Sequence, residues 1–182
     1  MYLLILHTET FLTILSTSQF KDSLMPLVLK AYECGNATLQ SLAVVKSDIL
    51  ASKLDFVFTK NQMLPRILKL CLNKNQNVQR DAVICLGKIY KIFDQTTVEK
   101  QIIPTLEKMR NSTRTPKINL VILAIYEGIA QTLGTKIIAE RILPSLIPIL
   151  NDDSLTYSEY SAYKKAVRSL LGKLEAEGAK RF

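Results

Sequence analysis

The chain has 182 residues, of which 48% are hydrophobic and 22% charged, so it can bury a substantial core and does not have the composition of a disordered protein. The net charge of +8 at pH 7 permits an acidic partner, such as nucleic acid, anionic lipid or an acidic protein segment, but does not choose between them. With one histidine and three cysteines, the chain lacks the parts for a His and Cys zinc site or a histidine-based triad, so we expect no metal and no cofactor.

Residues 1–17 are predicted to form one helix, the second half of a repeat whose first half is missing. Its start, Met1 to Leu6, is apolar but short and has no basic leader, so it does not read as a signal peptide. An exposed half-repeat leaves an apolar face in water, and we therefore expect the chain to be a truncated piece of a longer protein. Thr17 and Ser18 are predicted to supply a turn and a helix cap.

A short apolar phrase that ends in proline recurs along the chain. The four prolines are separated by 39, 39 and 40 residues, and in each case the two preceding residues and the second following residue are apolar. These prolines are Pro26, Pro65, Pro104 and Pro144. A fixed period near forty residues is typical of a stacked repeat protein in which each unit is a pair of antiparallel helices.

Four complete repeats follow the opening helix, each predicted to be two helices joined by a polar turn. Their expected bounds are 19–58, 60–94, 96–133 and 136–177, with a tail at 178–182. The turns contain Asn, Gly or Asp, and Pro116 is well placed as a first helical residue. Because Thr96, an expected cap, lies eight residues before Pro104, we predict a kinked first helix and not a helix that begins at the proline.

These elements predict an all-α fold, an α-solenoid of HEAT/armadillo-type helical hairpins, with residues 1–182 forming a single domain. The last helix, expected at about 157–177, is more polar than the others, as a capping repeat requires. The cysteines Cys34, Cys71 and Cys85 show no Cys-x-x-Cys spacing, and we expect reduced, buried thiols in a cytosolic protein. No apolar run approaches the roughly 20 residues of a membrane-spanning helix.

The segment Val78 to Ile89 reads Val-Gln-Arg-Asp-Ala-Val-Ile-Cys-Leu-Gly-Lys-Ile and resembles a HEAT repeat. A longer resemblance covers nearly the whole chain. The segments Arg80 to Met109, Leu123 to Tyr126 and Ala139 to Glu177 are similar to the SCY-like pseudokinases, in particular their coated-vesicle-associated branch. In that family a degenerate kinase domain precedes HEAT repeats, and a flexible tail binds clathrin and adaptors. The resemblance implies that this chain matches only the middle part.

Motifs of an active kinase are missing from the sequence. There is no Gly-rich loop, Val-Ala-Ile-Lys strand or His-Arg-Asp, and Asp55-Phe56-Val57 lacks the glycine of a metal-binding Asp-Phe-Gly. The segment Leu170 to Glu175 partly resembles a clathrin-binding box, but Lys173 occupies a position at which that motif has an apolar residue. We therefore expect no enzymatic activity and no nucleotide binding from this chain.

Two basic clusters are candidate partner-binding sites. The first crosses the turn of the third repeat and contains Lys108, Arg110, Arg114 and Lys117. The second lies on the last helix and contains Lys164, Lys165 and Arg168. Either can meet an anionic lipid surface or an acidic peptide, and the alternative is that both are ordinary solvated faces.

The sequence hypothesis is therefore a non-catalytic interaction scaffold. The resemblance implies the HEAT-repeat part of a SCY-like pseudokinase in clathrin-linked vesicle traffic, located in the cytoplasm at the periphery of Golgi and endosomal vesicles. Its implied partners are clathrin and adaptor proteins. The alternatives left open are a HEAT adaptor in nuclear or tRNA export, suggested by the basic charge and a related branch of the family, and a phosphatase-scaffold-like subunit.

Overall fold

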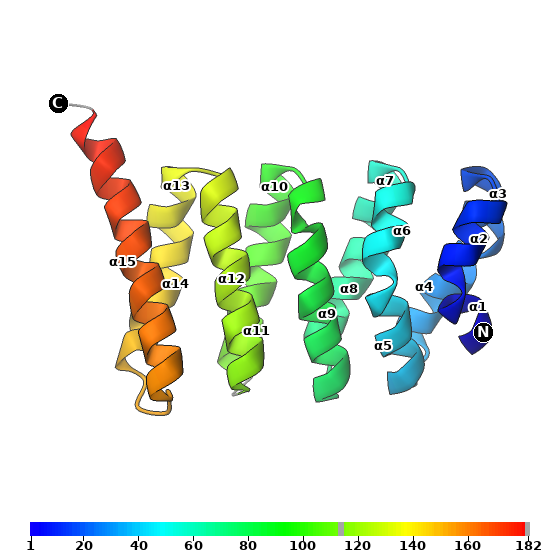
Figure 1. Cartoon of the computed structure of the whole chain (residues 1–182), viewed down its shortest axis with the longest axis horizontal. Helices are drawn as coiled ribbons and strands as arrows, with labels where there is room; N and C mark the ends of the chain where they lie inside the picture. The colour runs from blue at the N-terminus through cyan, green and yellow to red at the C-terminus, as the bar shows by residue number, and fades with distance from the viewer. Residues whose placement is uncertain (113–114, 181–182) are drawn as a thin grey trace. The chain divides into compact units, whose positions relative to one another are not determined.

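The computed structural model describes residues 1–112 and 115–180, and every regular element in these ranges is helical (Figure 1). The chain divides into two compact units, Met1–Thr105 and Leu106–Phe182. Helix α11, Ile103–Ser112, crosses the boundary between them. In the described part of the chain, no helix is both long and apolar enough to cross a bilayer. The all-α architecture predicted from the repeat period is confirmed.

The elements of the first unit, before α11, are α-helices except for π-helical η1 and η3 and 3-10 helical η2. They are α1 (Tyr2–Leu6), α2 (Thr8–Ile14), α3 (Thr17–Ser23), α4 (Met25–Glu33), α5 (Ala37–Val45), α6 (Ser47–Lys53), α7 (Phe56–Phe58), η1 (Thr59–Met63), α8 (Leu64–Cys71), α9 (Gln76–Ile89), η2 (Tyr90–Ile92), α10 (Gln95–Thr97) and η3 (Val98–Ile102).

After α11, the second unit contains π-helical η4 and 3-10 helical η5 among its α-helices. Its elements are α12 (Pro116–Thr132), α13 (Thr135–Ile137), η4 (Ile138–Ile142), α14 (Leu143–Leu146), η5 (Ile147–Asn151) and α15 (Tyr157–Ala179).

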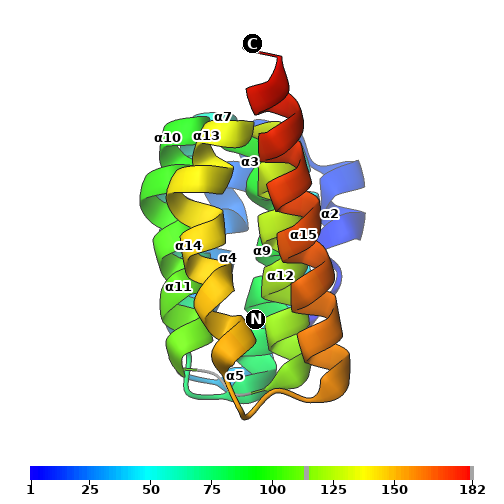
Figure 2. The same cartoon turned by 90° about the vertical axis from the view of Figure 1, so that its left-hand side faces the viewer.

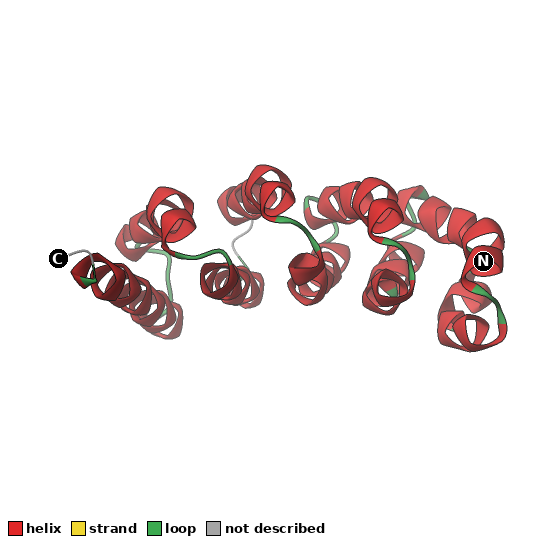
Figure 3. Ribbon diagram, turned by 90° about the horizontal axis from the view of Figure 1, so that it is seen from above, coloured by secondary structure: helices red, strands yellow, loops and turns green. Residues whose placement is uncertain are grey.

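Each unit is built from helical hairpins in two layers (Figure 3). In the first unit α4 packs on α5 within one hairpin and α8 on α9 within the next, while α4 contacts α8 and α5 contacts α9 between the hairpins. In the second unit α15 packs against both α12 and α14, and Figure 2 shows α13 and α14 running beside α15. Successive hairpins therefore cover each other's apolar faces, which is the arrangement of a repeat protein.

The core consists of the apolar positions that recur at helical spacing. In the first unit Met25, Met63, Leu64, Ile67 and Leu86 are fully buried, and they come from successive hairpins. Burying a side chain of this size stabilises the fold by roughly 1.5–3 kcal/mol, so most of the folding free energy comes from contacts within and between hairpins.

The first helix of each of the last three hairpins continues through its proline by way of a π-turn. The residue just before the proline donates its backbone N–H five residues back: Leu64 to Thr59, Ile103 to Val98 and Leu143 to Ile138. A proline inside an α-helix lacks an N–H and its ring clashes with the carbonyl four residues back, and a π-turn widens the helix at that point. As predicted, the first helix begins before the proline and not at it.

The residue after each of these prolines uses its side chain to donate a hydrogen bond to a backbone carbonyl near the π-turn. Arg66 donates from Nη1 to the Gln62 carbonyl at 2.8 Å, and Thr105 and Ser145 donate from their hydroxyls to the carbonyls of Gln101 and Arg141, at 2.8 and 2.9 Å. In every case the acceptor lies three residues before the proline. The side chain thus supplies a donor beside the point where the backbone ladder is broken.

The caps of these first helices recur with the same period as the prolines. They are Ser16, Asp55, Asp94 and Gly134. The helices of the second and third hairpins consequently begin at Phe56 and Gln95, earlier than the sequence prediction, and Ser16 replaces the predicted cap at Thr17 and Ser18. Gly134 has φ +81°, which disfavours any side chain there, so this helix has no side-chain cap.

The two aspartate caps also join successive hairpins of the first unit. Asp55 accepts from the Phe58 N–H with Oδ1 and from the ammonium of Lys21 with Oδ2, both at 2.7 Å. Asp94 repeats the arrangement 39 residues later, with the Thr97 N–H at 2.8 Å and Lys60 at 2.6 Å. Lys21 and the Phe58 N–H lower the pKa of Asp55, and Lys60 and the Thr97 N–H lower that of Asp94 to about 2.

Truncating a core side chain should cost far more stability than truncating an exposed one on the same helix. Leu86 of α9 is fully buried, whereas Ile84 is 40% exposed. We expect Leu86→Ala to lower the free energy of unfolding by about 2–5 kcal/mol because it leaves a cavity. Ile84→Ala should change it by only about 0.5 kcal/mol. Urea unfolding followed by circular dichroism measures both, and equal losses would contradict the described packing.

The aspartate bridges should make stability depend on acid. Because the pKa of Asp94 is lower in the folded state, its stabilisation is complete above the ordinary value near 3.8 and is lost as the pH falls toward about 2. We expect Asp94→Asn and Lys60→Gln each to reduce the loss of stability between pH 5 and 2. The effect of Lys60→Gln should be the smaller one, because the Thr97 N–H still lowers the pKa of Asp94, and the double variant should behave like Asp94→Asn. An unchanged pH slope in Asp94→Asn would show that the bridge contributes nothing.

Candidate interaction surface

The first predicted basic cluster lies where α11 and α12 meet in the second unit. Lys108 on α11 and Lys117 at the start of α12 are exposed, and Arg110 is half-buried. Arg114 lies outside the described residues. Lys108 and Arg110 are two positions apart on one helix, so they point to different sides. The structure therefore does not bring Lys108 and Arg110 together on one face.

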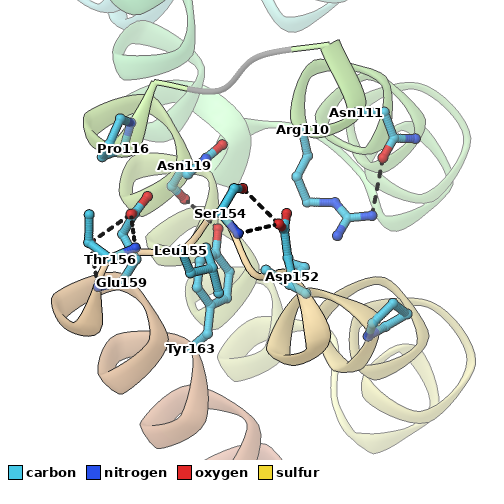
Figure 4. Close-up of a pocket in the computed structure, with 12 residues that line it drawn as sticks. Arg110, Asn111, Pro116, Asn119, Asp152, Ser154, Leu155, Thr156, Glu159 and Tyr163 are labelled. Carbon is cyan, nitrogen blue, oxygen red and sulfur yellow. Dashed lines mark hydrogen bonds between the residues drawn. The ribbon is translucent and has the colours of Figure 1, made fainter.

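Arg110 instead lines a pocket of about 430 Å³ at this end of the second unit (Figure 4). The pocket is formed by the end of α11, the first turns of α12, the segment after α14 and the start of α15. Its lining residues are Arg110, Asn111, Pro116, Asn119, Pro148, Ile149, Asp152, Ser154, Leu155, Thr156, Glu159 and Tyr163.

Arg110 and Asn119 each contribute a buried polar atom to the lining of this pocket. The Arg110 Nη2 donates to Asn111 Oδ1 at 3.2 Å, while its buried Nε has no acceptor among the described residues. The buried Oδ1 of Asn119 likewise has no donor among them. Two buried polar atoms of the pocket residues are thus left without a hydrogen-bond partner among the described residues.

The other polar groups of the pocket serve to hold the chain in place. Thr156 and Glu159 form a reciprocal capping box at the start of α15, in which the Glu159 carboxylate accepts from Thr156 N and Oγ1 at 3.0 and 2.7 Å. Asp152 accepts from the Ser154 N–H at 2.9 Å, as expected of a turn residue. Burial raises the pKa of Tyr163 to about 12, so its hydroxyl stays protonated at neutral pH and donates to the Asn119 carbonyl at 3.3 Å.

The second predicted cluster lies on the outer side of α15. Lys165 and Arg168 are exposed and Lys164 is half-buried, with its Nζ 5.8 Å from the centre of the Tyr160 ring. The structure brings these three cations together on the exposed part of one helix. Among the described residues, none of the three pairs with a carboxylate.

The cysteines differ in their surroundings. Cys71 and Cys85 are buried, as predicted, and burial raises the pKa of both thiols, that of Cys85 to about 12. Cys34 is exposed, so the prediction that it is buried was wrong: it follows the last residue of α4 and stands next to the turn at Gly35. The described residues contain no group of three or more His, Cys, Asp or Glu that could hold a metal ion.

The pocket residues Asn119, Glu159 and Tyr163 were not predicted as site residues. Asp152, which was also not predicted as a site residue, accepts hydrogen bonds from Ser154 N and Oγ in the turn before α15. A signal for Glu159 existed in the sequence, because Thr156 followed three residues later by Glu159 is the pattern of a capping box. Asn119 and Tyr163 are 44 residues apart and gave no local signal.

Comparison with known proteins gives relatives over nearly the whole chain, although no family model matches it. The chain is 26% identical over 178 residues to SCY1-like protein 2 of Mus musculus, covering 93% of this chain and 18% of that protein. It is 19% identical over 171 residues to the protein kinase domain-containing protein ppk32 of Schizosaccharomyces pombe, covering 92% of this chain and 23% of ppk32.

Among solved structures, the crystal structure of Cex1p superposes with a TM-score of 0.86 over 98% of this chain and 33% of Cex1p, at 20% sequence identity. This similarity supports the HEAT-type solenoid fold. The chain spans less than a quarter of the length of each of the two sequence relatives.

The capping box at the pocket should be measurable as helix stability. Thr156→Ala removes the hydroxyl that caps α15 and should lower the free energy of unfolding by about 1 kcal/mol. Thr156→Ser should retain most of the stability that the cap contributes, because serine also has a hydroxyl.

Thr115→Ala is the matched control, because Thr115 occupies the same position before α12 but makes no side-chain cap. Chemical denaturation of the variants provides the measurement. A loss at Thr115 as large as that at Thr156 would contradict the capping role.

Proposed function

Because the chain is related to the SCY1-like proteins, we propose that it is a non-catalytic scaffold that binds other proteins through the surfaces of its helical hairpins. The observation that supports this most strongly is the match to SCY1-like protein 2 across 93% of the chain, over a segment made of stacked hairpins. Stacked hairpins present long rows of exposed helix and turn, which are well suited to extended protein contacts.

The chemistry of the described side chains supports a binding role and not a catalytic one. In the pocket, Glu159 is engaged in a helix cap and Asp152 in a turn, while Tyr163 keeps its proton at neutral pH. Cys71 and Cys85 have raised pKa values, which disfavours the reactive thiolate. A phenol or thiol whose pKa is raised in this way is a poor base or nucleophile near pH 7.

We further propose a role in clathrin-linked vesicle traffic, with the chain in the cytoplasm at the periphery of Golgi and endosomal membranes. The support is the resemblance to the coated-vesicle-associated branch of the SCY-like pseudokinases, and clathrin and its adaptors are the partners it implies. The chain spans 18% of SCY1-like protein 2, so the activity and partners of the whole protein are part of the proposal.

A second candidate is an adaptor in nuclear or tRNA export. The net charge of +8 and the α15 cations Lys164, Lys165 and Arg168, which pair with no carboxylate in the described part of the chain, favour it, because a basic surface attracts a polyanion. A phosphatase-scaffold-like subunit is a third candidate with the same kind of fold. The three candidates differ in the partners they bind, so a binding assay can distinguish them.

Binding of purified partners tests the proposal. We expect the immobilised chain to capture purified clathrin or adaptor complexes at physiological salt, and to bind neither tRNA nor a phosphatase catalytic subunit. A thermal-shift assay with magnesium and ATP should show no change in melting temperature. If tRNA binds with a steep dependence on salt and the adaptors do not bind, the export role is correct instead. ATP binding would contradict the non-catalytic assignment.

A further inference from the structure

Four residues of α15 lie in one row, which we call the α15 stripe: Tyr157, Lys164, Arg168 and Leu171. Lys164 is half-buried and the other three are exposed. Their spacing of seven, four and three residues keeps them on one side of a helix with 3.6 residues per turn. Lys165 lies beside the row. The buried side of α15 is formed by other residues, among them Tyr163, Ala166, Val167 and Leu170.

The α15 stripe exposes apolar groups at both ends. Tyr157 is 87% exposed and Leu171 is 41% exposed, the highest values among the large hydrophobic side chains of α15. The middle of the row, between these two apolar ends, carries the positive charge of Lys164 and Arg168, with that of Lys165 alongside.

Among the described residues, Lys164 and Arg168 of the α15 stripe, and Lys165 beside it, lack the carboxylate partners that several lysines of the first unit have. Lys21, Lys46, Lys60 and Lys88 each pair with a carboxylate of another hairpin at 2.5–2.7 Å. Lys164, Lys165 and Arg168 pair with no carboxylate of a described residue. Three positive charges within two helical turns repel one another, and an acidic ligand would relieve this repulsion.

We propose that the α15 stripe binds an acidic segment of a second protein, with apolar residues at the ends of that segment resting on Tyr157 and Leu171. This inference extends the proposed scaffold function by naming the chemistry of a partner. The fourteen residue-to-residue steps from Tyr157 to Leu171 span about 21 Å of helix, which roughly six or seven steps of an extended segment cover. Charge complementarity gives the orientation and the apolar ends add burial.

An acidic protein segment fits this surface better than an anionic membrane does. Recruitment to anionic lipid is typical of clusters of roughly four to eight cations, more than the three present here. Glu175 lies four residues beyond Leu171 on the same side of α15 and is exposed, so it would oppose a flat negative surface. A short peptide can end before it reaches Glu175.

Fluorescence anisotropy with a labelled octapeptide, Phe-Asp-Glu-Asp-Glu-Asp-Glu-Leu, tests the inference on the full chain. We expect it to bind, and we expect the amide counterpart, with Asn and Gln in place of Asp and Glu, not to bind. The triple variant Lys164→Glu, Lys165→Glu, Arg168→Glu should weaken binding at least about tenfold. Tyr157→Ala should weaken it by a smaller factor without changing its salt dependence.

The matched control is Lys69→Glu, Lys74→Glu, Lys100→Glu, which changes the net charge equally at three exposed lysines of the first unit. We expect its affinity to stay within about twofold of the parent chain, since none of these three lysines belongs to the α15 stripe. Circular dichroism confirms folding, and Arg168→Gln replaces the triple variant if that variant unfolds. Equal loss in both triple variants would reduce the effect to overall charge and overturn the inference.

Vesicles containing phosphatidylserine provide the competing probe. Vesicle binding that depends on Lys164, Lys165 and Arg168, without peptide binding, would make the α15 stripe a membrane contact and overturn the inference. Absence of binding to both probes would overturn it as well. Peptide binding without any capture of clathrin or adaptors would leave the α15 stripe intact and remove only the trafficking role.

Discussion

A pair of helices cannot bury its apolar face alone, and this constraint determines the rest of the structure. Met63 and Leu64 on one helix and Leu86 on the next are fully buried only because hairpins stack. The polar contacts between hairpins follow from the same stacking. Asp55 and Asp94 each cap their own helix with one oxygen and receive a lysine of the preceding hairpin with the other. Such exposed bridges add little stability, but they favour one alignment of neighbouring hairpins.

The recurring proline shows how a repeat can keep a residue that disfavours helix. The π-turns at Thr59–Met63, Val98–Ile102 and Ile138–Ile142 widen the helix where the proline ring would clash. The side chain after the proline then donates to a nearby carbonyl. The same solution at three positions indicates that it belongs to the repeat and is not a local irregularity.

The period of the prolines and the helical spacing of apolar residues were sufficient to predict the fold class and most helices. The caps Asp55 and Asp94 were missed because apolar periodicity does not report the residue that ends a turn, although Lys21 and Lys60 recur with them at the same spacing. The grouping of Lys164, Lys165 and Arg168 was predictable because one helix holds them. The pocket was not, because Arg110, Asn119 and Tyr163 come from different helices and meet only through tertiary packing.

The relationship to SCY1-like proteins supports the proposed binding role. That role depends on hairpins stabilised mainly by their neighbours. Hydrogen exchange followed by mass spectrometry tests this most directly. We expect strong amide protection in Leu64–Cys71 and Gln76–Ile89, which neighbouring hairpins cover, and weak protection in Tyr2–Leu6, where Leu3 is 67% exposed. Equal protection of all three segments would contradict stabilisation by stacking.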